Sequence, residues 1–549
     1  MTTILSRREV LAAAPAAILG ARSGAAASVL AAATPVSCAV LDSQGEPLPV
    51  EKLQIFHICD SLMRPIPIEP QFAPGEVRFH PAERPFRVSL PLAVPGFGEV
   101  FVYADNRGRG HSRQSLAKAA PLLLNREFAA DRLATVRKLL DECRRAGLPI
   151  SAAAQRRADD AEALLKKAEA AAGGPAEVAR WSMESLRESL WAGEMIVLER
   201  ARQQIERQGP RPGFLFGAAA FGSSRYGRPY MERFEALFNF ATVPVYRHMV
   251  EPVEGKRDYS RLSEALDWLG ATNLVCKAHP LIFPNPGTPS WLRHKPIEQA
   301  RQLHLDYVRD TVLKFRHRIH AWDVINEAHV QPDSDSIGAF SKEQNVELTV
   351  AACRAARQAD PTCFRVVNST GTWCEYYMAR KPDPWQVSVY DYLQAVQDAK
   401  ADFEAIGLQY YYAGRDLLET ERDIETFKGF GKPIHITELQ IASASREVAG
   451  QSAAVVLMSN GKLPWLSGVQ HRPWHGERHT EETQADWAEG IYTLCFSKPY
   501  INAVTWWTVM DRAGSTGDLA GGGLLRGDGN PKESYTRLLS LLAKWRAMA

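Results

Sequence analysis

Apolar and polar residues alternate in a repeating manner over the second part of this 549-residue chain. Short apolar runs, typical of buried strands, are separated by longer amphipathic stretches, typical of helices. The expected strands are Gly213–Ala219, Phe238–Val243, Asn273–Phe283, Ala321–Asn326, Phe364–Asn368, Ala405–Tyr411, Pro433–Ile441 and Ala503–Val509. The expected helices between them include Arg261–Leu269, Ile297–Phe315, Val346–Gln358 and Glu481–Phe496. This α/β pattern predicts a (β/α)8 TIM barrel, whose parallel strands are buried on both faces.

An open doubly wound sheet is the alternative fold for alternating strands and helices. Such a sheet usually carries a Gly-rich phosphate-binding turn after its first strand. The stretch from Gly217 to Gly222 does not have that pattern, so a closed barrel over residues 211–549 is favoured.

The region before the barrel has a different character. From residue 35 to 111, short strand-like runs broken by Pro and Gly predict a small β-sandwich-like domain; examples are Leu53–Phe56, Phe86–Leu90 and Glu99–Tyr103. From 112 to 210 the pattern is helical, and the sequence Gly173-Gly174-Pro175 is expected to break this helical segment before a long helix near Ala179–Gln208.

The first 34 residues are expected to be an export signal. The pair Arg7-Arg8 precedes an apolar stretch, and small residues follow to Ala33. This arrangement is typical of a twin-arginine-type export signal and predicts a periplasmic or secreted bacterial protein. A chance Arg-Arg pair within an ordinary export signal is the alternative. No other segment reaches the ~18–20 apolar residues that a membrane-spanning helix needs.

Composition narrows the set of partners. The net charge is +2, so a polyanionic partner such as nucleic acid is not expected. The eight cysteines form no C-x-x-C pair and no zinc-type spacing with histidine, so we expect neither a metal nor another cofactor. Cys353, Cys363 and Cys374 either include a disulfide pair or are buried free thiols, and the sequence does not decide between them. Oligomeric state is not indicated.

Two glutamates stand where a barrel builds its active site, at the carboxyl ends of strands. Glu327 ends the fourth expected strand, and Glu438 lies in the seventh. Retaining glycosidases use two such carboxyls about 5–5.5 Å apart, one a proton donor with a raised pKa and one an ionised nucleophile. The alternative is that each glutamate is the structural partner of a barrel Arg or Lys.

The same residues carry a resemblance to a known family. Trp322–Glu327 resembles the acid/base signature of glycoside hydrolase family 10, the xylanase family, and Ile436–Leu439 resembles its nucleophile signature. Further matching elements follow in order: Ala278–Leu281, Pro289–Leu292, Gly407–Gln409, Val504–Trp507 with Asp511, and Leu524–Leu525 with Gly529–Lys532 and Tyr535. The resemblance covers about Phe214 to the C-terminus.

The resemblance implies a role for each matching residue. Glu327 would be the general acid and then the general base, and Glu438 would be the nucleophile that forms a glycosyl-enzyme. Asn326 would hydrogen-bond the sugar 2-hydroxyl. The other expected substrate-binding residues are His279, Gln409 and Trp507. His279 and Gln409 would orient the reacting sugar and the nucleophile, and Trp507 would form the floor of the subsite that holds this sugar. For His279, a core histidine with satisfied hydrogen bonds is the alternative.

Departures from the family pattern gather on the glycone side. Pro244–His248 stands where the family usually has Glu-Asn and, three residues on, Lys, so that His248 takes the place of the lysine. Tyr411 stands where the family has a histidine that supports the nucleophile, and we expect its hydroxyl to donate a hydrogen bond to Glu438 and favour the ionised form. The tryptophan of the third-strand element is Phe283, and the aspartate after the nucleophile motif is Gln440.

The resulting prediction is a retaining glycoside hydrolase that cuts internal β-1,4 linkages of a plant-type polysaccharide, with xylan as the first choice. The alternatives are the same mechanism on another β-linked glycan, or a carbohydrate-binding barrel without turnover. The long 442–478 segment is expected to shape the substrate site or to be an ordered surface insertion. The N-terminal sandwich is expected either to bind sugar or only to pack on the barrel.

Overall fold

The computed structural model describes residues 35–117, 121–284, 287–329, 340–373, 387–411, 414–444, 473–512 and 521–548. The expected export signal, Cys374 and the greater part of the 442–478 segment lie outside the described residues.

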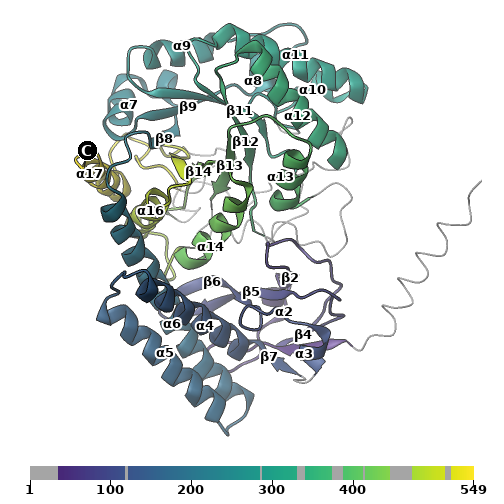
Figure 1. Cartoon of the computed structure of the whole chain (residues 1–549), viewed down its shortest axis with the longest axis vertical. Coiled ribbons are helices and arrows are strands. Elements are labelled where there is room, and N and C mark those ends of the chain that lie inside the picture. The colour runs from purple at the N-terminus through teal and green to yellow at the C-terminus, as the bar shows by residue number, and fades with distance from the viewer. Residues whose placement is uncertain are drawn as a thin grey trace, which may run out of the picture.

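Eight parallel strands close into a barrel in the order β10-β11-β12-β13-β14-β15-β8-β9 (Figure 1). The predicted (β/α)8 TIM barrel is therefore confirmed. The strands are β8 (Leu215–Ala219), β9 (Phe240–Pro244), β10 (Val275–His279), β11 (Ala321–Asn326), β12 (Phe364–Ser369), β13 (Ala405–Tyr410), β14 (Ile434–Leu439) and β15 (Ile501–Trp506). Residues of these strands are almost all buried, because side chains fill the interior on one face and contact the surrounding helices on the other.

Helices surround the strands and close the outer layer of the barrel (Figure 1). They are α7 (Ser223–Leu237), α8 (Arg247–Val250), α9 (Ser260–Leu269), α10 (Ser290–Arg293), α11 (Ile297–Phe315), α12 (Lys342–Ala359), α13 (Val389–Asp398), α14 (Leu417–Phe427) with the 3-10 turn η2 (Lys428–Phe430), α16 (Glu481–Phe496) and α17 (Glu533–Arg546). Local signals fix several helix starts. Ser341 caps α12 through a capping box with Gln344, and Asp416 caps α14 by accepting from Leu418 N and Glu419 N.

The residues before the barrel form two small sheets and a helical layer, which we call together the N-terminal module (residues 35–208). One sheet has the order β3-β4-β1-β7, and the other β2-β5-β6. The strands are β1 (Val36–Ala39), β2 (His57–Cys59), β3 (Gln71–Ala73), β4 (Glu76–Phe79), β5 (Arg87–Val94), β6 (Gly98–Ala104) and β7 (Leu122–Leu123). The helices are α2 (Val50–Leu53), α3 (Arg113–Ala117), α4 (Leu124–Arg145), α5 (Ala152–Ala170) and α6 (Pro175–Gln208).

The expected strand over Leu53–Phe56 is wrong. Pro49 has extended backbone angles and starts the single turn α2, with its carbonyl accepting from Lys52 N at 3.0 Å. Leu53 is the buried residue of that turn, so an apolar run that reads as a strand instead contributes one core side chain and a bend. The strand of this region, β2, begins only at His57.

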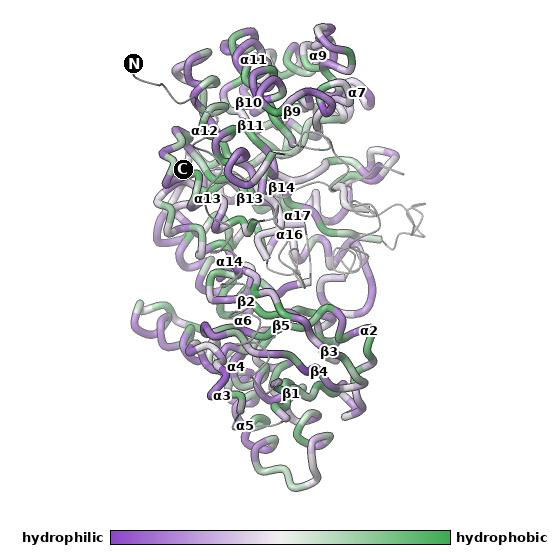
Figure 2. Tube along the Cα trace, turned by 90° about the vertical axis from the view of Figure 1, so that its right-hand side faces the viewer, coloured by the Kyte–Doolittle hydropathy of each residue, from purple (hydrophilic) through white to green (hydrophobic). Residues whose placement is uncertain are grey.

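The N-terminal module and the barrel share a hydrophobic core. One continuous cluster of buried residues contains barrel side chains such as Phe216 and Ile436 together with Phe101, Val136 and Ile196 of the module. Helix α6 packs against both α14 and α16, and Figure 1 shows it running from the module up the side of the barrel. In Figure 2 the two parts meet along β2, β5 and α14, where hydrophobic stretches run between them.

The seven described cysteines are all free and buried. Cys353 and Cys363 are among them, so of the two alternatives that the sequence left open, these two residues are buried free thiols. Within the described residues, no helix combines the length and the apolar character needed to cross a bilayer.

Candidate active site

The two glutamates lie at the carboxyl ends of the strands, together with most of the other expected site residues. Asn326 ends β11 directly before Glu327, His279 ends β10, and Trp507 directly follows β15. Glu438 lies near the end of β14. Strands β11 to β14 are neighbours in the barrel, so their ends converge on one mouth.

Strand register brings the side chains opposite one another. Asn326 on β11 pairs with Asn368 on β12, and Gln409 on β13 pairs with Glu438 on β14. Because parallel strands with matched register present their side chains at one level of the barrel, these residues form a single polar layer.

An amide network connects the two glutamates. Gln409 Nε2 lies 2.9 Å from Glu327 Oε1 and 3.3 Å from Asn326 Oδ1. Asn368 Nδ2 lies 2.7 Å from the same oxygen of Asn326 and 3.2 Å from Glu438 Oε1. The carboxyl of Glu327 is therefore linked to that of Glu438 through three amide side chains, in which Gln409 and Asn368 donate and Asn326 accepts from both.

The orientation of the central amide is set by a hydroxyl. Thr437 Oγ1 donates to Asn368 Oδ1 at 2.5 Å, which leaves the Asn368 amide nitrogen to donate to Asn326 and Glu438. A buried amide that makes bonds at both of its ends has one orientation.

Glu327 sits in an unusual backbone conformation. Its φ is 53°, in the left-handed region that non-glycine residues rarely adopt. Its backbone N–H donates to Asn368 O at 2.9 Å, which holds the turn after β11. Such a conformation costs about 1–3 kcal/mol and persists where the surroundings fix it, often at functional sites.

Glu438 receives a second donor. The hydroxyl of Tyr411 donates to Glu438 Oε2, while Asn368 donates to Oε1. Both carboxyl oxygens therefore accept hydrogen bonds, which is the pattern that favours an ionised carboxylate. The sequence-based expectation of a hydrogen bond from Tyr411 thus agrees with the geometry.

His279 is held by a buried ion pair. Its Nδ1 lies 2.7 Å from Asp323 Oδ2, and Lys277 Nζ lies 2.7 Å from the same oxygen. Burial lowers the pKa of His279, so the imidazole is neutral, with its proton on Nδ1 toward Asp323. The bare Nε2 faces Glu438 Oε1 at 3.8 Å and is available to accept a hydroxyl proton.

Asp323 stays ionised despite complete burial. Burial by itself would raise the pKa of Asp323, but Lys277 and His279 outweigh that effect and hold the pKa below its ordinary value. No role was expected for Asp323 or Lys277 from the sequence. Their signal was a charged residue inside an otherwise apolar strand, where an unpaired charge would be costly.

The two candidate carboxyls have raised pKa values. The pKa of Glu438 is raised to about 8, because burial and the neighbouring Glu327 raise it by more than the hydrogen bond from Tyr411 lowers it. Burial also raises the pKa of Glu327, against hydrogen bonds from Gln409 and Asn326. A close buried pair of carboxyls retains a proton that two exposed ones would lose. Since Glu438 has a donor on each oxygen, the shared proton is best placed on Glu327.

Aromatic rings line the site beside His279. The ring of Trp507 lies edge-on to that of His279 with centroids 5.1 Å apart, and Phe221 is 4.9 Å from Trp507. The ring centroid of Tyr246 lies 5.4 Å from that of His279 and 6.3 Å from that of Phe283. The side of the site next to His279 is thus lined by ring faces and edges.

Trp506 and Trp507 face in opposite directions, as alternation along a strand requires. Trp506 is fully buried outside the site, and its Nε1 donates to Gly522 O at 3.0 Å. His248 is not part of the polar layer: it is exposed on α8, with its ring 5.6 Å from Tyr246. The remaining expected residues, Asn326, His279, Gln409, Tyr411 and Trp507, surround the two glutamates.

Sequence reasoning missed Asn368. It ends the fifth expected strand, as Glu327 ends the fourth, so its place at the barrel mouth was implied by the strand assignment. Its role as the link between Asn326 and Glu438 appears only once the strand register is known.

Comparison with known proteins gives consistent matches. The model of the family described as "Glycosyl hydrolase family 10" matches residues 211–540. The chain is 21% identical over 289 residues to endo-1,4-beta-xylanase B of Thermotoga neapolitana, covering 52% of this chain and 73% of that protein. It is 25% identical over 209 residues to endo-1,4-beta-xylanase B of Paenibacillus barcinonensis, covering 35% of this chain and 58% of that protein. The crystal structure of native xylanase 10B from Thermotoga maritima aligns with 63% of this chain and 98% of that one, at 21% identity and a TM-score of 0.46.

Proposed function

Because the chain belongs to glycosyl hydrolase family 10 and is a glycoside hydrolase, we propose that it hydrolyses internal β-1,4 linkages of a plant-type polysaccharide, most specifically xylan, with retention of configuration. The observation that carries the proposal is the polar layer in which Glu327 and Glu438, from β11 and β14, are joined by buried amides. One carboxyl in that layer has the hydrogen bonds of an anion, and the other is the better site for a proton.

In the first step Glu438 attacks the anomeric carbon. The bond between that carbon and the leaving oxygen breaks, and the leaving oxygen takes the proton of Glu327. The products of this step are a glycosyl ester on Glu438, an ionised Glu327 and the departing sugar alcohol. Glu327 can ionise in this step because Glu438 becomes a neutral ester, so its negative charge no longer opposes a charge on Glu327.

In the second step Glu327 acts as the base. It takes a proton from water while the water oxygen attacks the anomeric carbon, and the ester bond to Glu438 breaks. Two inversions at one carbon give net retention. The enzyme returns to its starting state, with Glu438 ionised and Glu327 protonated.

The neighbouring residues suit the sugar in contact with the nucleophile. We propose that Asn326 hydrogen-bonds the 2-hydroxyl of this sugar. His279 accepts a hydrogen bond from another sugar hydroxyl through Nε2, because its Nδ1 is bound to Asp323. Trp507 offers its ring to the sugar face. Gln409 positions Glu327 through its 2.9 Å hydrogen bond.

The choice of xylan rests on the relatives, which are named endo-1,4-beta-xylanases. The aromatic cluster of Phe221, Tyr246, Phe283 and Trp507 favours a second candidate, another β-linked glycan. Ring faces do not make the directional hydrogen bonds by which a site discriminates one pattern of hydroxyls from another, and such bonds are worth several kcal/mol in selectivity.

The experiment is a reducing-sugar assay on a panel of xylan, cellulose, mannan and mixed-linkage β-glucan. We expect the fastest release from xylan, with a fall in viscosity that marks internal cleavage, and with β-configured product seen first by proton NMR. Glu438→Ala should abolish release. Glu298→Ala, at a glutamate whose side chain is 81% exposed on α11, is the matched control and should not change it.

Each other outcome has its own meaning. Fastest release from a different β-glycan would favour the second candidate. Binding of a polysaccharide without release, by wild type and Glu438→Ala alike, would favour a carbohydrate-binding barrel. First appearance of the α-anomer would contradict the two-step mechanism.

We also propose that the chain is exported through its first 34 residues. The test is expression in a bacterial host with Arg7 and Arg8 both replaced by Lys. Loss of the protein from the periplasm and medium is expected for a twin-arginine-type signal, whereas unchanged export would assign the segment to the ordinary type.

A further inference from the structure

The segment that joins β13 to α14 is held from outside the barrel. We call residues 414–419 the β13–α14 junction. It begins three residues after Tyr411, the hydrogen-bond donor to Glu438, and runs into the first turn of α14. Its contacts with the N-terminal module involve nearly every residue of the junction.

The first contacts come from β6. The backbone N–H of Phe101 donates to the carbonyl oxygen of Gly414 at 2.9 Å, in the manner of a bond between two neighbouring strands. Arg415 donates from Nε and Nη2 to the hydroxyl of Tyr103, at 3.1 and 2.9 Å. The guanidinium of Arg415 also lies over two rings, 4.5 Å from Phe101 and 4.2 Å from Trp373.

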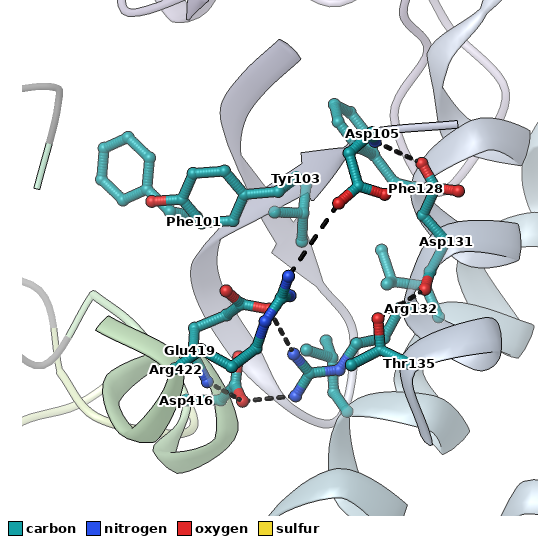
Figure 3. Close-up of a pocket in the computed structure, with 13 residues that line it drawn as sticks. Phe101, Tyr103, Asp105, Phe128, Asp131, Arg132, Thr135, Asp416, Glu419 and Arg422 are labelled. Carbon is teal, nitrogen blue, oxygen red and sulfur yellow. Dashed lines mark hydrogen bonds and ion pairs between the residues drawn. The ribbon is translucent and has the colours of Figure 1, made fainter. Parts of the chain in front are cut away.

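The next contacts come from α4 and α6. Arg132 of α4 forms ion pairs with Asp416 and with Glu419, the latter at 3.1 Å, and Figure 3 shows its guanidinium between the two acidic side chains. Glu194 of α6 accepts from Leu417 N at 3.0 Å. Asp416 and Arg132 are buried, so these are charges removed from water and paired across the boundary.

This arrangement differs from a loosely linked domain contact. Interfaces between independent domains are usually polar, hydrated and compatible with relative motion. Here a charged pair and a bidentate arginine are buried, and the hydrophobic core continues across the boundary. Removing one partner of such a pair leaves an uncompensated buried charge, so the junction has few alternative positions.

The junction is also connected to the site by packing. Trp373, which lies under Arg415, packs edge-on against Tyr410, the residue before Tyr411, with ring centroids 5.1 Å apart. Three residues of chain span at most ~10 Å, so the fixed place of Gly414 restricts where Tyr411 can lie. The contacts of β6 are thereby transmitted over a short distance to the hydroxyl that faces Glu438.

We infer that the N-terminal module is a working part of the catalytic unit, and that Tyr103, acting through Arg415, is a positioning residue that holds Tyr411 against Glu438. The inference rests on the proposed role of Glu438 as nucleophile. It departs from both sequence-based expectations for the module, which were sugar binding or packing alone.

The first test is Tyr103→Phe in the full chain, which keeps the ring and removes the hydroxyl that Arg415 contacts. We expect kcat to fall roughly 3–10-fold, in the range typical of coupling through packed residues, with KM unchanged because Tyr103 does not touch the substrate. The acidic limb of the kcat/KM profile should move to higher pH, since a displaced Tyr411 stabilises ionised Glu438 less well.

Two further variants sharpen this test. Arg415→Lys keeps the charge but loses the bidentate geometry, and it should change rate and acidic limb in the same direction. The matched control is Arg64→Gln, which removes an ion pair of 3.3 Å between the module and Asp391 of α13, away from the junction. Its rate and pH profile should equal those of wild type, whatever its melting temperature.

A double-variant cycle then separates positioning from general loosening. If Tyr103 acts through Tyr411, Tyr103→Phe should cause no additional shift of the acidic limb in a Tyr411→Phe background. Independent, additive effects of the two substitutions would overturn the inference, as would a wild-type rate and limb for Tyr103→Phe.

Hydrogen exchange provides a readout that does not depend on turnover. Tyr103→Phe and Arg415→Lys should speed amide exchange in residues 414–419 and leave α11 unchanged. If wild type hydrolyses no glycan, the proposed function fails, and exchange still tests the junction. Unchanged exchange in 414–419 would contradict the inference even in an active enzyme.

Discussion

The hydroxyl of Tyr411 donates a hydrogen bond to the carboxyl of Glu438. This bond lowers the pKa of Glu438, against the effect of burial, so Tyr411→Phe should raise that pKa further. Because attack needs ionised Glu438, the acidic limb of kcat/KM should move to higher pH. A hydrogen bond to a charged group contributes about 1.5–3 kcal/mol, so a rate loss on the order of 10–100-fold is expected near neutral pH.

The measurement is kcat/KM from pH 4 to 10 for both proteins. Tyr390→Phe is the control, because Tyr390 packs on Phe430 of η2, with ring centroids 5.0 Å apart. An acidic limb and rate that do not change in Tyr411→Phe would show that the bond has no role in catalysis.

Glu327→Gln should remove the basic limb of the pH profile and leave the acidic limb in place. In the active form Glu327 holds the proton and Glu438 is ionised, so loss of the proton from Glu327 defines the basic limb. Glutamine is uncharged like protonated Glu327, does not titrate, and keeps a hydrogen-bonding side chain for Gln409. The profile is measured with an aryl glycoside whose leaving group needs no protonation. On polysaccharide, loss of the general acid should reduce kcat by about 10²–10⁴.

Burst kinetics with the aryl substrate measure the first step separately from the second. A basic limb that persists in Glu327→Gln would mean that a group other than Glu327 loses the proton, and would contradict the placement of the shared proton on Glu327.

The sequence predicted those parts of the fold that depend on local pattern. Helix Ile297–Phe315 and strand Ala321–Asn326 have the expected bounds, because each has an unbroken period and clear flanking signals. The expected strand Asn273–Phe283 ends instead at His279, since Pro280 has no N–H to continue the ladder. Local patterns therefore fix the order of the elements better than their ends.

The site was predictable only as far as its residues stand at strand ends. Asn326, Gln409 and Glu438 meet because three strands are in register, and the same register adds Asn368, which no motif identified. The pairing of Arg132 with Asp416 joins positions 284 residues apart. Local sequence carries no signal for such a contact, so the junction was outside the reach of sequence reasoning.

Asp323→Asn should destabilise the barrel through Lys277. The lysine is 1% exposed and its ammonium lies 2.7 Å from Asp323, so neutralising the aspartate leaves a buried cation without its partner. The expected loss in the free energy of unfolding is about 3–5 kcal/mol. The double variant with Lys277→Met removes both charges and should recover most of that loss.

Urea unfolding of the two variants and wild type measures the difference. Recovery of stability in the double variant without recovery of activity is expected, because Asp323 also fixes the proton of His279 on Nδ1. A single variant as stable as wild type would mean that water or another group compensates Lys277.

Glu438→Gln should stabilise the protein, and more so at higher pH. Burial and the neighbouring carboxyl raise the pKa of Glu438 to about 8 against an ordinary value of 4.5, so the buried pair keeps one proton, placed on Glu327, that the unfolded chain loses. Stability therefore falls between about pH 4.5 and 8 by up to ~1.4 kcal/mol per pH unit. Glutamine at position 438 removes the charge that holds this proton on Glu327, so the slope should become smaller.

The stability gained by the variant should be small near pH 5 and should rise toward pH 8, by at most about 5 kcal/mol. Melting curves across this range measure it, with Glu298→Gln, at the exposed position on α11, expected to follow wild type throughout. A gain that does not depend on pH would mean that the folded pair binds no more protons than the unfolded chain, and the shared proton would have to be abandoned.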